Sequence, residues 1–318
     1  MKRFLLSIMS AAAILPCHAQ SAASSIQTAD TAVVYHIREI SPGSLIRIYD
    51  ALGRPAKGKT GIKISSGESD KTNHLDTALI NPLARKTAGR FIECNTAYAG
   101  SRLSSEEHFN TAEKHGFIGI DIMDSLETAE LPVKNGFHLD KDIVGKRFLD
   151  YDFIIVLSHF KGHQMGGFGG ALKNISIGIA SKEGKAYIHS AGQTDRPASA
   201  GTFSAAQDDF LESMADACKA IADHCGDNIL YINVANRLSV DCDCNANPAA
   251  PEMADFGILA SLDPVALDQA CVDMVFNSSD PGKHALVERI NSRHGTHTIE
   301  AAEKLGIGTR NYKIITLE

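Results

Sequence analysis

The sequence predicts an α/β fold: a mixed, largely parallel sheet flanked by helices. Short apolar runs of strand length alternate with longer amphipathic stretches, which is the order that parallel sheets require. The composition, 44% hydrophobic and 22% charged, is that of a globular protein. The 318 residues are enough for one large domain or two intimate lobes.

The first 19 residues have the pattern of a secretory signal peptide. A positive start at residues 1–3 precedes an apolar stretch at 4–16, and Ala19 is a small residue at the cleavage position. The apolar stretch is shorter than the ~20 helical residues that span a bilayer. We therefore expect an exported protein, periplasmic or extracellular. A disordered linker is expected at 20–31 and a single domain at 32–318.

Strands are predicted where apolar and β-branched residues cluster in short runs. They fall at residues 32–36, 60–65, 90–95, 153–158, 228–235 and 256–261. Helices are predicted where a capping residue precedes a longer amphipathic stretch, as at Ser41-Pro42 and Asp263-Pro264. The predicted helices cover residues 41–52, a segment ending at 82–87, 104–115, 206–224 and 263–275.

Four of the predicted strands are followed by loops rich in polar, Cys, His and Gly residues. These loops are residues 65–68, 94–96, 158–170 and 241–244. In an open α/β sheet the ligand crevice lies beyond the carboxyl ends of the strands. The sequence therefore predicts that the four loops converge on one site.

The most informative segment is SHFKGHQMGGFGGALKN, residues 158–174. Its glycines either bind a ligand or let two elements pack tightly, and a phosphate-loop or GxGxxG pattern is absent. We favour the close approach of a small ligand or cofactor over a nucleotide. The candidate binding residues are Gly166, Gly167, Gly169, Gly170 and Lys161.

Three residues of this segment are candidate catalytic groups. His163 is a base whose pKa lies near neutrality, and His159 is a second imidazole four residues earlier. Lys173, partly desolvated in a tight glycine-rich loop, would be nucleophilic or would attach a cofactor. The alternative is that the histidines are structural, as a lone histidine more often is.

The cysteines offer a candidate metal site. Cys242-Asp243-Cys244 is either a two-thiolate half-site for zinc or iron, completed by Cys94 or a histidine, or a pair of small buried residues in a turn. A mutual disulfide is not expected there, because it would close a small strained ring. Cys218 and Cys225 lie on a predicted helix with a rise of ~10 Å between them, too far for a bridge.

Several motifs resemble the domain of unknown function 362 family across residues 33–312. They include GIKISSGESDKTNHLDTALINPL, IECNTAYAGSRLSSEEHFNTAEKHGF, DCDCNANPAAPEMADFGILASLDPVALDQA and AAEKLGIGTRNY. Many members carry a ferredoxin-like insertion with two cysteine-rich iron–sulfur motifs. This chain has no cysteine between His189 and Cys218. We therefore expect no iron–sulfur cluster, and the electron-transfer role of the family is not carried over.

One segment also resembles nickel-dependent lactate racemase. A catalytic histidine, a cofactor-holding lysine ten residues later and a nickel-ligating histidine sixteen residues further on correspond to His163, Lys173 and His189. The second catalytic histidine is placed by region only, at His108 or His115. A chain exported unfolded carries no preassembled cofactor. We therefore expect either no cofactor or a simple divalent ion, zinc or iron, held by His189 and the Cys242/Cys244 pair.

Two functions from different classes remain. The first is a secreted isomerase or redox enzyme acting on a small oxygenated molecule. The second is a metal- or ligand-binding module without turnover. A net charge of −7 without a basic tract argues against nucleic acid as a partner, and no segment after the signal peptide is apolar enough to span a membrane.

Overall fold

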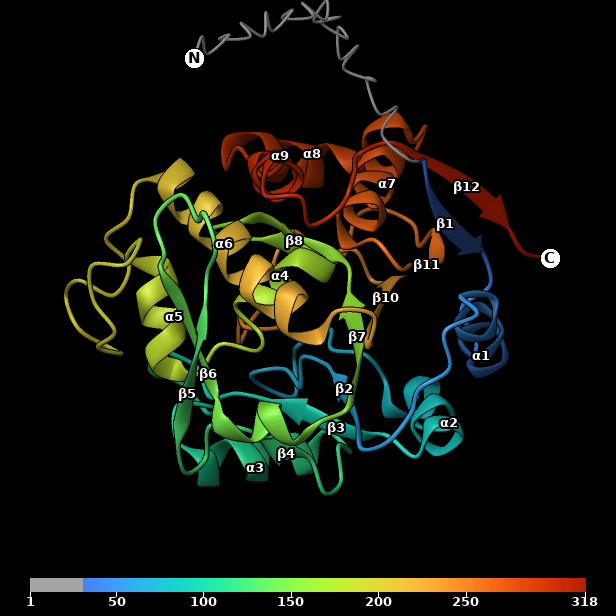
Figure 1. Ribbon diagram of the computed structural model, residues 1–318. Coiled ribbons are helices and arrows are strands. Elements are labelled where there is room, and N and C mark those ends of the chain that lie inside the picture. Colours follow the sequence, from blue (N-terminus) through green and yellow to red (C-terminus); the bar gives the residue numbers. More distant parts are fainter. Residues whose placement is uncertain (1–30) are drawn as a thin grey trace, which may run out of the picture.

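The computed structural model describes residues 31–318. The predicted signal peptide and residues 20–30 of the predicted linker lie outside the described residues. An eight-stranded sheet runs through the described part in the order β12-β1-β11-β10-β7-β2-β3-β4 (Figure 1). Its strands are β1 Ala32–Ile37, β2 Thr60–Lys63, β3 Arg90–Glu93, β4 Asp121–Ile122, β7 Phe153–His159, β10 Ile229–Ala235, β11 Gly257–Ser261 and β12 Tyr312–Thr316.

The sheet is mixed and mostly parallel, as predicted. Strands β10, β7, β2, β3 and β4 form a continuous parallel block, and β12 is parallel to β1. Only β11 runs antiparallel to its neighbours, β1 and β10. Two hairpins stand apart from this sheet: β5 Thr128–Pro132 with β6 Lys141–Gly145, and β8 Lys161–His163 with β9 Gly167–Gly169.

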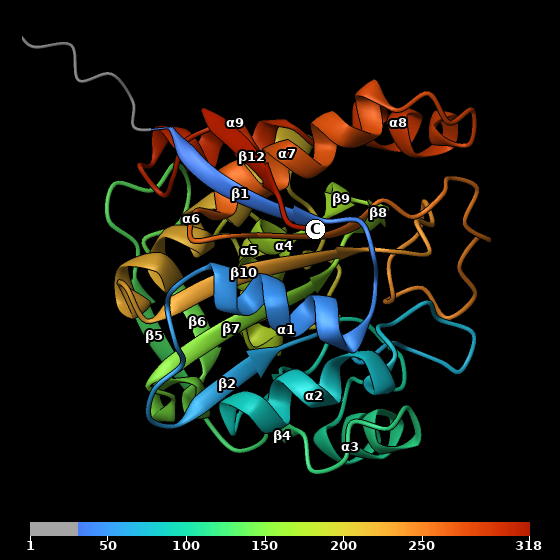
Figure 2. The same ribbon diagram turned by 90° about the vertical axis from the view of Figure 1, so that its right-hand side faces the viewer.

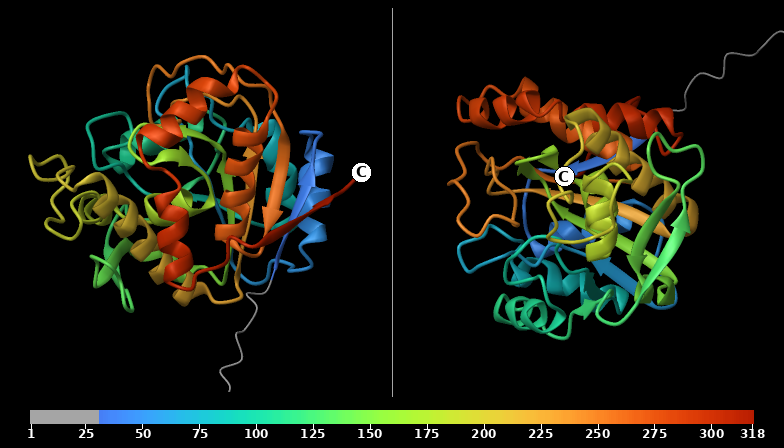
Figure 3. Two further views of the ribbon diagram at one scale, coloured as in Figure 1. Left: turned by 90° about the horizontal axis from the view of Figure 1, so that it is seen from above. Right: turned by 90° about the vertical axis from the view of Figure 1, so that its left-hand side faces the viewer.

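Helices cover both faces of the sheet. On one face α1 and α2 pack over the central strands and α3 packs beside the edge strand β4; Figure 2 shows α1 and α2 in front of the central strands. On the other face lie α4 to α9, with α5 beside the β5–β6 hairpin (Figure 3). The helices are α1 Pro42–Ala51, α2 Thr77–Thr87, α3 Ser105–Lys114, α4 Ala171–Ser176, α5 Lys182–His189, α6 Gln207–Cys225, α7 Pro264–Asn277, α8 Lys283–Ser292 and α9 His297–Lys304.

The two apolar layers follow from the alternation of side chains along the strands. In β7, Ile154 and Val156 belong to the core under α4 and α6, whereas Ile155 and Leu157 belong to the core under α1 and α2. Such a strand is buried on both faces, so it appears in the sequence as a continuous apolar run. Because both layers need helices, the sheet sits in the middle of the molecule.

Local signals set the helix ends. The Ser41 side chain accepts a hydrogen bond from the Ser44 N–H, and Pro42 occupies the first turn of α1. At α7 the Asp263 carboxylate accepts from the N–H groups of Val265 and Ala266. Both predicted starts are confirmed, as are the other predicted strands and helices. None of the described helices is long and apolar enough to cross a membrane.

The order of the strands places a crevice between β2 and β7. From β2 the chain builds outward through β3 and β4, then returns to add β7 on the other side of β2 and continues to β10. Adjacent parallel strands whose connections leave in opposite directions open a crevice at their carboxyl ends. The four loops predicted to converge all leave from this edge.

Candidate functional site

A cavity of about 330 Å³ lies at the carboxyl ends of the parallel strands. Each of the four predicted loops contributes at least one lining residue: Ser65 after β2, Cys94 and Thr96 after β3, His163 after β7, and Cys244 after β10. The convergence of the loops is therefore confirmed. Of the predicted site residues, the cavity brings together His163, Lys173, His189, Cys94 and Cys244.

The ionisable side chains of the lining are mostly basic. Lys63, Lys173, Lys185 and Arg102 all line the cavity, and Glu93 supplies the only carboxylate among the described lining residues. Glu93 is itself ion-paired, because the Arg102 guanidinium lies 2.9 Å from one carboxylate oxygen, and His108 contacts the other at 3.1 Å. The excess positive charge favours an anionic ligand.

The amine of Lys173 differs from those of its neighbours. Lys63 donates to Asn174 Oδ1 at 3.1 Å, and Lys185 donates to the Ala180 carbonyl at 2.6 Å. In the described part of the chain, the Lys173 amine has no hydrogen-bond acceptor and no ion-pair partner within reach. Its head group is thus free to meet a ligand.

Burial and nearby cations lower the pKa of two of these lysines. Burial is the largest cause that lowers the pKa of Lys173, and the positive charges of Lys161 and Lys63 act in the same direction; together they bring this pKa to about 7. Burial also lowers the pKa of Lys63 to about 8. Near neutral pH a large fraction of the Lys173 amine is therefore unprotonated and nucleophilic.

A carboxylate from another helix holds the element that carries Lys173. Helix α4 has six residues and no side-chain cap of its own. The Asp268 carboxylate of α7 accepts from the N–H groups of Ala171 and Leu172 at 2.8 and 2.9 Å. This contact satisfies two of the free amides at the start of α4 and fixes its direction.

The two cavity histidines present opposite hydrogen-bonding atoms. His163 Nδ1 accepts from the Gly166 N–H at 2.8 Å, so the hydrogen of the neutral ring is on Nε2. His189 Nδ1 donates to the Lys185 carbonyl at 2.6 Å, which leaves the lone pair on Nε2. Burial lowers the pKa of both rings, that of His189 to about 4. The free lone pair lets His189 accept a proton where His163 cannot, and the lowered pKa makes both rings weaker bases than the near-neutral imidazole expected from the sequence.

A buried ionic network forms the wall beneath the cavity. Arg102 donates from Nε to Glu68 and from Nη1 to Glu93, both at 2.9 Å. His108 contacts Glu93 from behind, and His115 Nδ1 lies 2.6 Å from the Ser66 carbonyl. Neither of these histidines lines the cavity. His108 and His115, the two candidates for a second catalytic histidine, thus contact residues of the cavity wall without facing the cavity.

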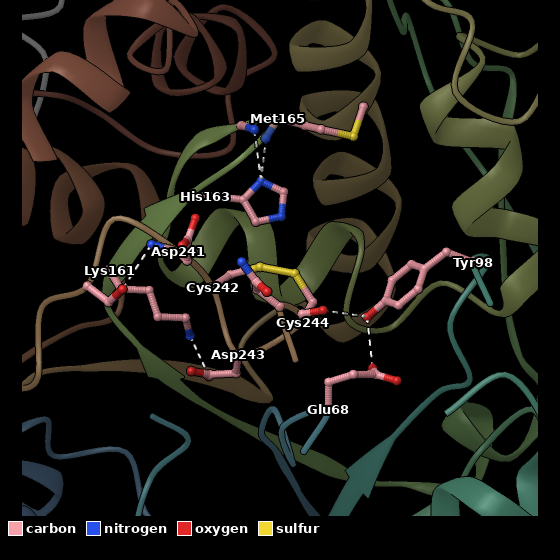
Figure 4. Close-up of a disulfide and its surroundings, with 12 residues drawn as sticks. Glu68, Tyr98, Lys161, His163, Met165, Asp241, Cys242, Asp243 and Cys244 are labelled. Carbon is pink, nitrogen blue, oxygen red and sulfur yellow. Dashed lines mark hydrogen bonds and ion pairs between the residues drawn. A yellow bond between two sulfur atoms is a disulfide. The ribbon is translucent and has the colours of Figure 1, made fainter. Parts of the chain in front are cut away.

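The structure contains a disulfide between Cys242 and Cys244, at the edge of the cavity (Figure 4). The sequence-based argument against this bridge was wrong. That argument considered only the small ring, whereas the loop is also shaped by the buried side chain between the two cysteines. Asp243 contacts Lys161 Nζ at 2.5 Å and His159 Nδ1 at 3.0 Å, and its carbonyl accepts from the Glu68 N–H at 2.9 Å.

His159 and Lys161 lie outside the cavity lining. Both ring nitrogens of His159 contact acceptors, Asp243 Oδ1 and the Asn236 carbonyl. The Lys161 amine contacts the His159 carbonyl and the Asp243 carboxylate. Their side chains anchor the cysteine loop, and their predicted catalytic and ligand-binding roles stay predictions that the geometry does not favour.

The glycines of the β8–β9 segment pack against the protein. A Cβ on Gly167, whose φ is +79°, would lie 2.8 Å from the Gly295 Cα, and one on Gly170 would lie 2.3 Å from Asp268 Oδ1. A Cβ on Gly166 would approach the His163 ring at 3.3 Å, and Gly169 has no neighbour within 4 Å. None of the four lines the cavity. At Gly167 and Gly170 the glycines thus allow other parts of the protein, rather than a ligand, to approach the backbone closely.

The candidate metal ligands that lie together in the structure differ in part from the predicted set. Ligand atoms of His163, Cys242 and Cys244 lie within 4.8 Å of one another. His189 and Cys94 are not in this group. The Cys94 thiol donates to the Ile179 carbonyl at 3.2 Å, and burial raises its pKa far above the ordinary value. A second group, His138, Asp209 and Glu212, lies at the surface.

Sequence reasoning missed four charged residues of the cavity lining: Lys63, Glu93, Arg102 and Lys185. Lys63 and Glu93 each end a short buried strand, where an ionisable residue next to an apolar run is a usable signal. Arg102 lies in a loop and Lys185 in a short helix, and neither position carries a local pattern that separates it from surface charge.

Comparison with known proteins assigns the family. A model of the family described as domain of unknown function (DUF362) matches residues 61–273. The chain belongs to this family. The predicted membership is confirmed, and a comparison with curated protein sequences found no match.

Among solved structures, the DUF362 chain is similar to the lactate racemase apoprotein from Thermoanaerobacterium thermosaccharolyticum. The identity is 14% and the TM-score 0.38, over 90% of this chain and 82% of that chain. It is also similar to a Thermotoga maritima protein, at 15% identity and a TM-score of 0.39, over 73% of this chain and 57% of that chain.

Proposed function

We propose that this DUF362 protein is an enzyme that binds a small oxygenated anion in the cavity and catalyses an isomerisation or redox step at a carbon bearing oxygen. The observation that carries the proposal is the Lys173 amine. It is unpaired among the described residues, has a pKa of about 7, and shares one cavity with two histidines of opposite hydrogen-bonding character.

The charges of the lining support an anion such as a 2-hydroxy acid or a 2-oxo acid. Lys63 and Lys185 offer positive charge around a cavity whose one carboxylate is already paired with Arg102. A cavity of about 330 Å³ suits a small molecule. The register of His163, Lys173 and His189, which resembles that of nickel-dependent lactate racemase, also supports this substrate class.

The three groups can divide the chemistry between them. The unprotonated amine of Lys173 can remove a proton next to a carbonyl or attack the carbonyl carbon. Nε2–H of His163 can donate a hydrogen bond to a substrate oxygen, and Nε2 of His189 can accept one. The His189 ring is held between the rings of Phe203 and Phe210, at centroid distances of 4.9 and 4.7 Å, which fixes its orientation.

Thermal stabilisation by a panel of 2-hydroxy and 2-oxo acids tests the proposal. We expect one or more of these acids to raise the melting temperature of the wild type and of a Lys134→Met control, which removes an exposed lysine. We expect Lys173→Met to lose the response. If no acid stabilises the wild type, or if Lys173→Met responds fully, the catalytic proposal is wrong.

A second candidate is a metal-binding module at His163, Cys242 and Cys244. The observation in its favour is that their ligand atoms lie within 4.8 Å of one another. Zinc or iron would bind there only after the disulfide is reduced, because the thiolate is the ligand. Elemental analysis of reduced wild type and of Cys242→Ser decides the matter: stoichiometric metal in the first and none in the second supports the module.

A further inference from the structure

We propose that Cys242 and Cys244 form a redox-active pair that undergoes thiol–disulfide exchange with small thiols, entering from outside at Cys244. This activity does not require the reaction proposed for the cavity, although His163 and Cys244 belong to both sites. It rests on three features of the described residues: unequal access to the two cysteines, a hydrogen-bond donor beside the bridge, and a buried anchor between the cysteines.

The two cysteines differ in their access to solvent. Cys244 is partly exposed and lines both the cavity and a separate outer groove of about 440 Å³. Cys242 is 2% exposed and lines neither. The groove is of a size that admits a small molecule. An incoming thiol therefore reaches the sulfur of Cys244, and Cys242 is the leaving group.

The imidazole of His163 lies beside the bridge. Its ring is held from the other side by the N–H groups of Gly166 and Met165, which donate to Nδ1 at 2.8 and 3.3 Å (Figure 4). The hydrogen of the neutral ring is then on Nε2. A ring nitrogen of His163 lies within 4.8 Å of both sulfur atoms, so a small approach of the Cys242 thiolate completes a hydrogen bond.

Asp243 keeps the loop in place when the bridge opens. Its carboxylate is buried and paired with Lys161 and His159, and its carbonyl accepts from the Glu68 N–H. These contacts do not involve either sulfur. The reduced cysteines therefore stay close together, which is the condition for the bridge to form again.

The exchange balances with small thiols as the reductant. A thiolate RS⁻ attacks Sγ of Cys244, the bond between the two sulfurs breaks, and Cys242 leaves with the electron pair as a thiolate beside His163. A second RS⁻ attacks the sulfur of R in the mixed disulfide, and RSSR departs with Cys244 left as a thiolate. Two RSH become one RSSR, and the bridge takes up two electrons and two protons.

Glutathione provides the test. Native wild type is equilibrated in mixtures of reduced and oxidised glutathione, quenched with acid, alkylated and analysed by mass. We expect the Cys242–Cys244 bridge to open and close reversibly without denaturant. If the bridge stays closed in excess reduced glutathione until the protein is unfolded, the proposal is wrong.

Two matched variants test the direction of attack. In Cys242→Ser, the remaining Cys244 is accessible, and we expect oxidised glutathione to label it. In Cys244→Ser, the remaining Cys242 is buried, and we expect labelling to be at least tenfold slower. Equal rates in two variants with wild-type melting behaviour would overturn the assignment of Cys244 as the attacked sulfur. The wild-type measurement decides the proposal if either variant does not fold.

Discussion

The Lys173 amine and the Arg102 guanidinium line the same cavity but differ in their ion pairing. The amine has no acceptor among the described residues and a lowered pKa. The guanidinium is buried between two carboxylates, Glu68 and Glu93. An unpaired buried charge lowers the stability of the fold. Removing one member of a buried ion pair also lowers it, because the partner is left buried without an opposite charge. The first pattern is typical of a functional group and the second of a supporting one.

Replacing Lys173 with Met should stabilise the protein. The folded pKa of about 7 lies below the unfolded value, so the unfolded chain binds more protons between about pH 7 and 10, and wild-type stability rises with pH in that window. Below pH 7 we expect Lys173→Met to be more stable by roughly 1–2 kcal/mol, a figure reduced for screening by water in the cavity.

Urea denaturation at several pH values measures this effect. The advantage of Lys173→Met should shrink as the pH rises from 7 to 10, whereas Lys134→Met should show no such trend. A Lys173→Met protein that is less stable than wild type at pH 7 would contradict the lowered pKa.

Replacing Arg102 with Met should destabilise the protein strongly. The change leaves the Glu68 and Glu93 carboxylates buried without their cation, which costs about 3–5 kcal/mol. Burial alone would raise the pKa of Glu93, but Arg102 and His108 hold it well below its ordinary value. The wild-type contribution is therefore present above about pH 4.3 and lost as the pH falls further.

Chemical denaturation at pH 7 and at pH 4 tests this dependence. We expect a large loss at pH 7 and a smaller one at pH 4. Arg85→Met, at an exposed position of α2, should change stability by less than ~0.5 kcal/mol. An equal loss for Arg102→Met and Arg85→Met would refute the role of the buried network.

At the scale of elements, the short helix α4 depends on a neighbour for its position. Its starting amides bind the Asp268 carboxylate of α7, and Asn233 of β10 donates to the same carboxylate at 2.8 Å. Burial raises the pKa of Asp268 to about 6. Gly170 lies directly against this carboxylate. The glycine is therefore required by the packing of α4 on α7, and the position of Lys173 follows from it.

A pair of glycine substitutions isolates this contact. In Gly170→Ala the new Cβ would lie 2.3 Å from Asp268 Oδ1, so the carboxylate must move, and we expect a loss of about 1–3 kcal/mol. In Gly169→Ala the Cβ meets nothing within 4 Å, and we expect a change of less than ~1 kcal/mol. Thermal unfolding compares the two. Similar losses in both would show that the contact with Asp268 is not the reason for the glycine.

Long or fully buried elements could be predicted from the sequence, whereas short elements held by distant residues could not. Strand β7 is buried on both faces and helix α6 is long and amphipathic, so both have strong sequence patterns. Helix α4 and the β8–β9 hairpin are short and are held by contacts from residues distant in sequence. The convergence of the site was predictable because it follows from strand polarity. The positions of Lys63 and Arg102 were not, because they depend on tertiary packing.

Over the whole molecule, the cysteines divide into one pair and four separate thiols among the described residues. Cys94, Cys218, Cys225 and Cys271 are free and buried, in the two helices α6 and α7 and in the wall of the cavity. Burial raises the pKa of each thiol, that of Cys225 to about 12. Such thiols are unreactive while the fold is intact.

Counting alkylated thiols by intact mass checks this division. Among the described residues we expect no alkylation of the four free thiols in the native protein. Four groups should react after unfolding without a reductant, and six after unfolding with one. Reaction of any of the four in the native state, or of six without a reductant, would contradict the pairing.

The position of β1 has a consequence for the order of folding. Val34 pairs with Ser261 in β11 and with Ile314 in β12, so the first described strand is completed only by the last ones. Bringing such distant segments together is slow, because the chain must close long loops before the contacts form. A nascent chain that has not yet reached β11 leaves β1 with both edges open for intermolecular pairing. Until β11 and β12 have been synthesised, β1 can therefore pair with another copy of the chain, and the unfinished chain is prone to aggregate.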